Sequence, residues 1–505
     1  MSAPTVLLLG MGGLPDQDLT RVDFPRLRTW QFARAILHAD AQARARGQTG
    51  IKLKLLAGLS AEDMARLSPP STGSRPLLKA GPALSWRDAT LDGQTFQVCY
   101  VPETDFDRAE LPAQWWEASQ ADRVVSAGPF RPARAAGRMP EGVPVWVDVP
   151  GDPMAEAALR VEATGDPMHL QHAFEMHVSA LRRGDAFSTI SHRQHLTLLG
   201  QLGLLGRVQS SGMMPPVVHT IPVGMEPLWR QWLQTDSAQS SVLKAISNSQ
   251  ESIYSASDAE SQPFIVLWPG AFNTWADLDT FFEGVTAAQA HDARIQAVVT
   301  GGPIPGHEEL AWRRLQERVA AAGLTSRWTF TGWLEASEAA RRVTQADVGV
   351  CLDRACLEAH LGSRTRVLYG ASLGLPWILN PTCELNESLI HAGLATSLPP
   401  GDAEGLTRLL LNLVQTRSSP RASQRAKHPL PSPTLPPALF PFEGQTPAAA
   451  LIEWVQQPWS LGRGIDPLHG LQERVSALEQ TLDRIHHSPT WRILGGIHRR
   501  LKGWY

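Results

Sequence analysis

Two arginines late in the sequence carry its strongest chemical signal. Arg364 and Arg366 stand at the start of a helix-like stretch that runs to Gly374. The N-terminal end of a helix carries a partial positive charge, so cations are disfavoured there. A bound diphosphate would offset this cost, because a planar guanidinium group pairs well with phosphate oxygens. We therefore interpret the pair as a diphosphate-binding site; a surface salt bridge to Glu358 is the alternative.

Three other predicted strands end in residues suited to a nucleotide. The residues that follow them are Gly270, Gly301 with Gly302, and Trp333. Glycine lets the backbone pass close to a ligand, and a tryptophan ring can stack on a nucleobase. A tryptophan that fills the core is the alternative for Trp333. We predict that these four residues shape a nucleotide pocket.

The segment after Gly270 is expected to begin a helix near Thr274 or Trp275. Thr274 followed by Asp277 resembles a capping box, which marks a helix start. Such a helix would direct unpaired N–H groups and its positive dipole end toward a phosphate. Asn273 lies in the same turn and is a further donor-binding candidate. An ordinary strand–turn–helix connection is the alternative.

The first half of the chain holds two candidates for a catalytic base. Asp148 ends a predicted strand before a Pro-Gly turn, and His192 begins a predicted helix. A base must lie within hydrogen-bond reach of the hydroxyl it deprotonates. The structural alternatives are a turn-forming aspartate and a partly exposed helix residue. Gly12 and Gly13 follow the first predicted strand, and we expect both to face a cleft and give a ligand room.

The elements that must position these residues predict an α/β fold. Between residues 263 and 415, short apolar runs alternate with amphipathic helical stretches, as in βαβ units with a parallel sheet. Such sheets bind ligands at the carboxyl ends of their strands. The first 220 residues repeat the pattern less regularly. We therefore predict two Rossmann-like domains whose parallel sheets face a central cleft, followed by a C-terminal helical tail.

Composition shifts divide the chain into five parts. The predicted parts are a first α/β domain at 1–224, a polar linker or insertion at 225–262, a second α/β domain at 263–416, a Pro/Ser-rich linker at 417–447, and C-terminal helices with a basic aromatic tail at 448–505. In the last part, apolar residues spaced by four and three form a heptad-like stripe, enough for one docked helix.

Overall composition narrows the class of protein. Of 505 residues, 43% are hydrophobic, which permits a sizeable core. The 46 basic residues against 49 acidic ones give a net charge of −3, so we expect no nucleic-acid partner. Four cysteines are too few for a disulfide scaffold, and the first residues lack a basic leader. We therefore expect a cytoplasmic protein.

The last residues suggest contact with a membrane surface. Residues 488–505 combine tryptophans and aliphatic side chains with arginine and lysine. A basic amphipathic segment binds anionic lipid surfaces, which would place the protein on the inner face of the membrane. A C-terminal helix that docks back on the first domain is the alternative.

Two Asp-x-Asp patterns, at 277–279 and 105–107, have the form in which some enzymes hold a divalent metal on a diphosphate. Asp277 fits better as an acidic residue at a helix start, where the dipole favours it. We therefore predict no metal.

Taken in order, WPG, GG, F-x-G and SRTR followed by SLGLP resemble the C-terminal half of GT-B glycosyltransferases. They are most similar to the bacterial, family-four-like branch that builds cell-surface polysaccharide. In the first half, ADRVVSAG, PVWVDVPGDP, SHRQ and HTIPVGMEP stand in the expected order. The resemblance covers residues 1–415 and is strongest over 263–400, and SPTWRI also recurs at the ends of such enzymes.

The resemblance implies a nucleotide-sugar donor bound mainly by the second domain. It implies an acceptor, which is a glycan, a lipid-linked molecule or a protein, on the first. No cofactor or metal is strictly required, because basic side chains and helix N-termini neutralise the leaving diphosphate. Cell-surface polysaccharide or glycoconjugate synthesis is the expected role.

The sequence departs from the larger family at its paired glutamates. Many retaining members carry two glutamates separated by seven residues, and Leu361 and Tyr369 stand at the matching positions here. Glu358 is a close neighbour of the first position and is a third catalytic candidate. The stereochemical outcome therefore stays open. An inactive GT-B scaffold and a sugar-nucleotide epimerase on the same fold are the alternative functions.

Overall fold

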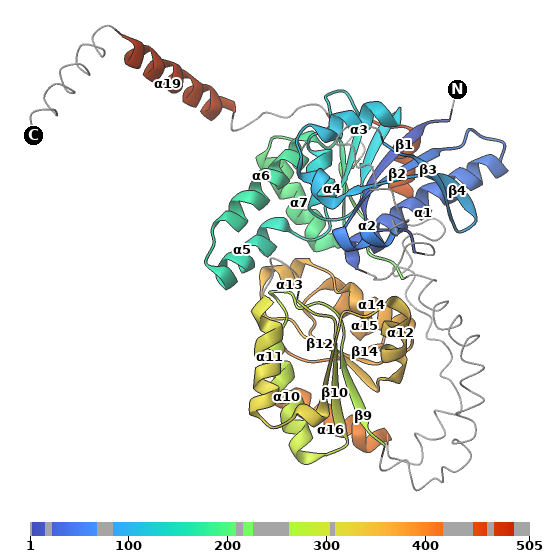
Figure 1. Ribbon diagram of the computed structural model, residues 1–505, viewed down its shortest axis with the longest axis vertical. Helices are drawn as coiled ribbons and strands as arrows, with labels where there is room; N and C mark the ends of the chain where they lie inside the picture. Colours follow the sequence, from blue (N-terminus) through green and yellow to red (C-terminus); the bar gives the residue numbers. More distant parts are fainter. Residues whose placement is uncertain are drawn as a thin grey trace, which may run out of the picture.

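The computed structural model describes residues 3–15, 23–67, 84–208, 216–225, 262–303, 309–417, 448–461 and 469–488. Its described elements form two α/β bodies, one above the other in Figure 1. Apart from their end residues, the predicted linkers at 225–262 and 417–447 lie outside the described residues. Among the described helices, none is long and apolar enough to cross a membrane.

The first body contains an eight-stranded sheet of order β3-β4-β2-β1-β5-β6-β7-β8. Only β3 is antiparallel to its neighbour. Its strands are β1 (Thr5–Met11), β2 (Lys52–Leu59), β3 (Arg87–Leu91), β4 (Gln94–Pro102), β5 (Arg123–Ser126), β6 (Val145–Asp148), β7 (Ala186–Thr189) and β8 (Val218–Thr220). Its helices are α1 (Phe24–Ala45), α2 (Ala61–Leu67), α3 (Leu111–Ser119), α4 (Arg131–Ala136), α5 (Pro153–Thr164), α6 (Met168–Arg183) and α7 (His192–Leu204), with the short 3-10 helix η1 (Glu103–Asp107).

The second body contains a six-stranded sheet of order β11-β10-β9-β12-β13-β14, and all its pairs are parallel. Its strands are β9 (Phe264–Trp268), β10 (Ile295–Thr300), β11 (Trp328–Gly332), β12 (Val348–Cys351), β13 (Trp377–Leu379) and β14 (Ala395–Ser397). Its helices are α10 (Leu278–His291), α11 (Glu309–Ala321), α12 (Ala336–Gln345), α13 (Leu357–Leu361), α14 (Thr365–Ser372), α15 (Glu384–His391) and α16 (Ala403–Arg417), with the 3-10 helix η4 (Thr325–Arg327).

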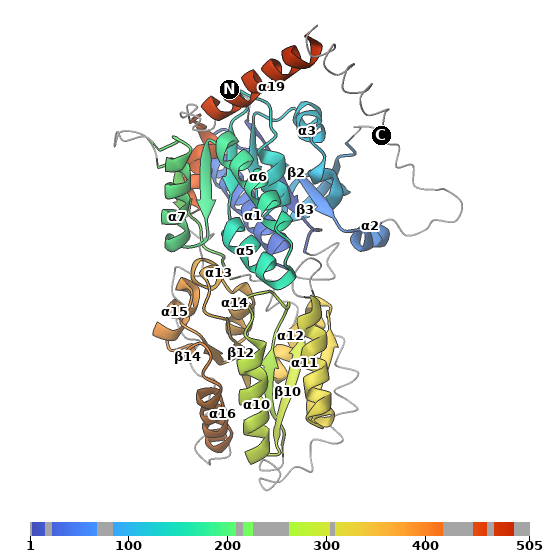
Figure 2. The ribbon, with the colours of Figure 1, turned by 90° about the vertical axis from the view of Figure 1, so that its left-hand side faces the viewer.

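Burial explains why the strand sequences are almost continuously apolar. Val6, Leu7, Leu8 and Leu9 of β1 are fully buried, because helices cover both faces of the sheet. Two-sided burial of this kind is typical of parallel α/β sheets (Figure 2). The predicted architecture of two such domains with parallel sheets is confirmed.

The chain returns to the first domain after the second. Helix α18 (Ala449–Gln456) packs Leu451, Trp454 and Val455 into the core that also holds Val6. The Trp454 ring lies 5.8 Å from the Trp146 ring, edge to face. Part of the predicted C-terminal region is therefore integral to the first domain.

The last described helix, α19 (His469–His487), forms where the heptad-like stripe predicts one. The side chains of Val475, Leu478, Leu482 and Ile485 are exposed, so the predicted docking of this helix through its apolar stripe is not found among the described residues. The basic aromatic tail beyond residue 488 lies outside the described residues, so the membrane-surface prediction remains a prediction.

Hydrogen bonds between α7 and α15 join the two domains. The carboxylate of Glu384 accepts the backbone N–H of His192 at 2.9 Å and that of Arg193 at 2.6 Å. The Arg193 guanidinium in turn donates to both oxygens of Glu387, each at 2.7 Å. A carboxylate of the second domain thus caps a helix of the first, where the dipole favours a negative charge.

Candidate functional site: the cleft between the two domains

A cavity of about 980 Å³ lies between the domains. Loops that follow β1 and β6 line it from the first domain, and loops that follow β9, β10 and β11 line it from the second. These are the carboxyl ends of parallel strands, where such sheets bind ligands. Helices α5 and α6 of the first domain and α14 of the second complete its walls.

Two glycine loops of the second domain touch at the cavity. Gly301 has a φ of +79°, and a Cβ there would lie 2.2 Å from the carbonyl oxygen of Gly270. Its N–H donates to the carbonyl oxygen of Gly332 at 2.8 Å. Only glycine allows this approach. The predicted convergence of Gly270 and Gly301 at one site is therefore found, and both line the cavity.

Trp333 also lines the cavity, with 38% of its surface exposed. Gly302 is not among the lining residues. A Cβ at Gly302 would lie 3.1 Å from Trp333 Nε1, so this glycine makes room for the indole ring. Its predicted contact with the ligand is thus replaced by a supporting role.

Arg366 reaches over the loop that follows β9. Its Nη1 donates to the carbonyl oxygen of Ala271 at 2.8 Å and lies 3.4 Å from that of Pro269. No described carboxylate lies within ion-pair distance of it. No side chain caps the start of α14, where Arg366 is the second residue. An uncapped helix start beside an arginine that binds only carbonyl groups is suited to an anion.

Arg364 does not join Arg366 in a diphosphate-binding site, as the sequence predicted. It is 2% exposed, and its Nε donates to Asp353 Oδ2 at 2.7 Å. Its Nη1 lies 3.9 Å from Glu358 Oε1. Because carboxylates already bind this guanidinium, its predicted role in holding a diphosphate is wrong. The alternative, a salt bridge to Glu358, is found, but it is buried instead of lying at the surface, and Asp353 is the closer partner.

The predicted helix start after Gly270 is wrong as well. Helix α10 begins at Leu278, and Asp277 caps it by accepting the N–H of Thr280 at 3.0 Å. The carboxylate of the chain therefore occupies the helix end that was expected to face a phosphate. Asn273 still lines the cavity, whereas Asp277 does not.

The second aspartate of each Asp-x-Asp pattern is paired with arginine. Asp279 is paired with Arg318, and Asp107 with Arg131 and Arg134. In the part of the chain that the structure describes, no group of three or more His, Cys, Asp or Glu side chains is arranged to hold a metal ion.

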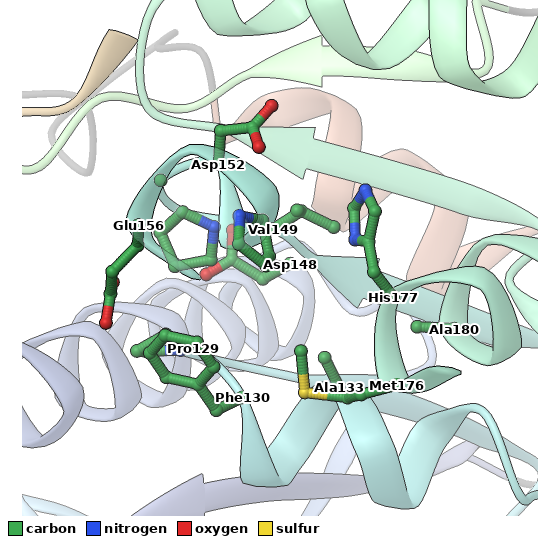
Figure 3. A pocket seen from close by; sticks show the side chains of 13 residues that line it. Pro129, Phe130, Ala133, Asp148, Val149, Asp152, Glu156, Met176, His177 and Ala180 are labelled. Atoms are coloured by element: carbon green, nitrogen blue, oxygen red, sulfur yellow. The ribbon is translucent and has the colours of Figure 1, made fainter. Parts of the chain in front are cut away.

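Asp148 is fully buried and lies beside a small pocket rather than the main cavity (Figure 3). Arg28 donates to both its oxygens at 2.8 Å, and Ser188 Oγ donates to Oδ1 at 2.6 Å. The N–H of Gly128 adds a bond to Oδ2 at 3.1 Å. When hydrogen-bond donors already occupy both oxygens of a carboxylate, the carboxylate cannot readily take a proton from the hydroxyl group of a substrate. The predicted catalytic base at Asp148 is therefore wrong; the residue ties β6 to α1.

His192 also lies away from the cavity. It is the exposed first residue of α7, at the junction with Glu384. It is not among the lining residues. The prediction of a base at His192 is wrong because the helix start that carries it faces α15 instead of the cleft.

The two N-terminal glycines differ. Gly12 lines the cavity with a φ of +80°, and a Cβ there would lie 2.0 Å from Arg26 Cγ. Gly13 is not among the lining residues, and its carbonyl oxygen accepts a hydrogen bond from Trp30 Nε1 at 2.9 Å. Gly12 therefore matches its predicted position, and Gly13 does not.

Glu358 lines the cavity and is 4% exposed. Burial raises its pKa to about 8, against the opposing effect of Arg364. Its Oε2 has no hydrogen-bond partner among the described residues. Of the three predicted catalytic residues, it is the one that reaches the cavity, and it holds a proton near neutral pH. Tyr369, which stands where the larger family has a glutamate, also lines the cavity.

Two residues of α5 that line the cavity were not predicted from the sequence. Glu156 and Arg160 share one helix face with Pro153 and Ala157, and all four line the cavity. Burial raises the pKa of Glu156 to about 7, while Arg160 opposes the rise. A spacing of three or four residues on an amphipathic helix does not distinguish a ligand-facing charge from a solvated one, so the sequence offered no signal.

Comparison with known proteins agrees with this geometry. Residues 263–416 match the family model described as "Glycosyl transferases group 1". No curated protein matches the chain. Among solved structures, an alpha,alpha-trehalose-phosphate synthase (UDP-forming) from Burkholderia vietnamiensis is 10% identical, with a TM-score of 0.53 over 90% of this chain and 97% of that one.

Two further structures are similar over most of their length. The alpha,alpha-trehalose 6-phosphate synthase from Burkholderia multivorans is 11% identical, with a TM-score of 0.52 over 85% of this chain and 93% of its own. A trehalose-6-phosphate structure from E. coli bound with UDP-2-fluoro glucose is 11% identical, with a TM-score of 0.50 over 94% and 99%. At these identities the likeness shows the fold. The chain thus has the GT-B fold, and its second domain, residues 263–416, matches the group 1 glycosyl transferases.

Proposed function

We propose that this enzyme moves a sugar from a nucleotide-sugar donor in the second domain to a glycan, lipid-linked or protein acceptor on the first. The observation that carries the proposal is Arg366. It lines the interdomain cavity beside the uncapped start of α14 and has no described carboxylate partner. A leaving nucleoside diphosphate gains negative charge as the glycosidic bond breaks, and preorganised donors at that position stabilise the transition state.

The same loops accommodate the rest of the donor. The diphosphate lies against Arg366 and the backbone at Gly270 and Gly301, which carry no side chain to exclude it. The nucleoside extends toward Trp333, whose exposed ring offers a stacking surface. The E. coli structure of the same fold is bound with UDP-2-fluoro glucose, which supports a uridine nucleotide as the first donor to test.

Glu358 is the proposed catalytic residue. A carboxyl group that holds its proton near neutral pH donates a hydrogen bond to a sugar hydroxyl or to the leaving oxygen. Catalysis without a metal or other cofactor is part of the proposal, with Arg366 and the helix start neutralising the diphosphate. The proposal also includes a role in cell-surface polysaccharide or glycoconjugate synthesis and a cytoplasmic location at the inner face of the membrane.

A thermal-shift screen with UDP, GDP, dTDP and CMP tests the donor site. We expect one nucleoside diphosphate to raise the melting temperature of the wild-type protein. The same nucleotide should leave the melting temperature of Arg366→Gln unchanged. Arg318→Gln is the matched control, because Arg318 lies on the same domain and is paired with Asp279 away from the cavity. No response to any nucleotide would favour the inactive scaffold. Nucleotide release that needs no acceptor would favour the epimerase.

A further inference from the structure

The arginines that line the cavity divide into two groups. Four of them are bound to carboxylates of the described chain: Arg26 to Asp23 and Asp63, Arg131 to Glu103 and Asp107, Arg134 to Asp107, and Arg364 to Asp353. Arg160 and Arg366 have no described carboxylate within 4.0 Å. A cation that is partly removed from water without a counter-ion is costly, so each of these two sites favours an anionic ligand.

The proposed nucleotide-sugar donor would balance the charge of only one of these two arginines. Arg366 belongs to the second domain and faces the proposed diphosphate position. Arg160 belongs to α5 of the first domain, on the opposite wall. In both views of the molecule, α5 lies at the edge of the first domain that faces the second (Figures 1 and 2). Its charge is therefore directed at whatever the first domain binds.

Arg160 is incompletely bonded where it stands. Its Nε is buried and has no hydrogen-bond partner among the described residues. A buried donor left without an acceptor is unfavourable, because it has lost its hydrogen bond to water. An anionic ligand in the cavity would balance the charge of the guanidinium.

Two histidines stand on the adjoining helix. His169 and His172 of α6 line the same cavity, together with Ala173 and Met176 of the same helix face. Helices α5 and α6 form an antiparallel pair joined by a short turn at Gly165. The second half of α5, with Arg160, therefore lies beside the first half of α6, with the two histidines. Imidazole N–H groups and a guanidinium group together form a set of hydrogen-bond donors.

The acidic residue of α5 that lines the cavity is Glu156, one helical turn before Arg160. Its pKa is raised to about 7 by burial, so near neutral pH it is protonated in part of the molecules. It then offsets only part of the charge of Arg160. Glu358 of the second domain, whose pKa is about 8, adds little negative charge below that pH.

We propose that the first-domain wall of the cavity, through Arg160 with His169 and His172, binds an anionic group of the acceptor, a phosphate or a carboxylate. This inference rests on the proposed function and specifies its acceptor class. A neutral glycan would offer hydroxyl oxygens as hydrogen-bond acceptors but would leave the charge of the guanidinium without a counter-ion.

Anion binding to the full-length protein tests the inference directly. We use isothermal titration with glucose 6-phosphate, glucuronic acid and glucose as probes, at pH 6.5. Wild-type protein should bind the phosphate or the carboxylate sugar at least tenfold more tightly than glucose. Which of the two binds more tightly identifies the anion.

Four variants separate this site from the donor site. Arg160→Gln should lower the affinity for the anionic sugar by tenfold or more and leave nucleoside diphosphate binding within twofold of wild type. Arg366→Gln should lower the affinity for the nucleoside diphosphate by tenfold or more and leave that for the anionic sugar within twofold of wild type. Arg134→Gln, on the same wall but already paired with Asp107, should leave affinity for the sugar within twofold. Glu156→Gln should raise the affinity at pH 8 severalfold and leave it nearly unchanged at pH 6, because only the higher pH charges the glutamate.

Each contrary result has a defined meaning. Equal binding of the three sugars by the wild-type protein, or unchanged affinity for the anionic sugar in Arg160→Gln, overturns the acceptor inference while the donor site stands. Loss of nucleotide binding in Arg160→Gln with retention in Arg366→Gln overturns both assignments. Far-ultraviolet circular dichroism of every variant ensures that a folded protein is compared.

Discussion

The guanidinium of Arg366 donates a hydrogen bond of 2.8 Å to the carbonyl oxygen of Ala271. This bond joins the start of α14 to the loop after β9, although the two segments lie 95 residues apart in the sequence. The arginine therefore has a fixed orientation before any ligand arrives. A preorganised donor needs little rearrangement when it meets a developing charge, which is how such groups stabilise transition states.

Replacing Arg366 with lysine tests the importance of its shape. Lysine keeps the positive charge but has a single ammonium group, which cannot bond the carbonyl groups and a phosphate with the same fixed geometry. We expect Arg366→Lys to weaken binding of the nucleoside diphosphate by about tenfold, and Arg366→Gln to weaken it further. Titration calorimetry measures both. Equal affinities of the lysine variant and the wild type would show that charge alone suffices.

Gly301→Ala should damage the donor pocket through contact with backbone. The new Cβ would stand 2.2 Å from the Gly270 carbonyl oxygen, and φ is +79°. Gly323→Ala is the matched control, since φ there is +69° and no atom lies within 4 Å of the added carbon. Both pay the strain of a left-handed residue, about 1–2 kcal/mol. Only Gly301→Ala must also move the loop, so its melting temperature should fall further and nucleotide binding should weaken.

The opposite result would be informative. If the two alanine variants melt together and bind nucleotide equally, the contact between the two glycine loops is not a feature of the folded protein in solution.

Asp148→Asn should act on stability instead of chemistry. The substitution leaves the buried Arg28 without its counter-ion, and breaking a buried ion pair costs about 3–5 kcal/mol. Chemical denaturation of the first domain should show this loss. In the fraction that remains folded, nucleotide affinity should equal that of the wild type. A fully stable variant that has lost only its transfer activity would restore Asp148 as a catalytic residue.

Glu358 makes stability depend on pH. Its pKa rises from 4.5 to about 8 on folding, so between these values the folded state binds more protons than the unfolded state. The free energy of unfolding therefore falls as the pH rises through this window, by up to about 1.4 kcal/mol per pH unit. Glu358→Gln removes this dependence and should be more stable than the wild type at pH 8.5, with little difference near pH 5.

Thermal melts at several pH values measure this effect. Glu404→Gln serves as the control, because its carboxylate on α16 is almost fully exposed. Parallel pH profiles for the wild type and Glu358→Gln would show that the buried carboxyl group is not protonated on folding.

The sequence predicted the fold well because the signals are local. Buried parallel strands are continuous apolar runs, and β9, β10 and β11 all form at the predicted places. The glycines after them keep their expected position because close approach of two backbones requires glycine in any packing. Local pattern and tertiary structure agree at these residues.

The wrong site predictions concern side chains whose binding partners are distant in the sequence. Arg364 and Arg366 are neighbours along the chain, but Asp353 binds the first and only carbonyl groups hold the second. Nothing in the run Ser-Arg-Thr-Arg distinguishes them. Asp148 ends a strand at the sheet edge that was expected to face a ligand, yet Arg28 of α1 already occupies it. Such pairings depend on how helices pack over the sheet, which sequence periodicity does not specify.

The central claim is that Arg366 and the start of α14 bind the diphosphate of the donor. The most direct measurement compares UDP with uridine by titration calorimetry, in the wild type and in Arg366→Gln. We predict that the wild type binds UDP far more tightly than uridine and that the variant loses most of this difference while its affinity for uridine is unchanged. A variant that keeps the full preference for UDP would contradict the claim.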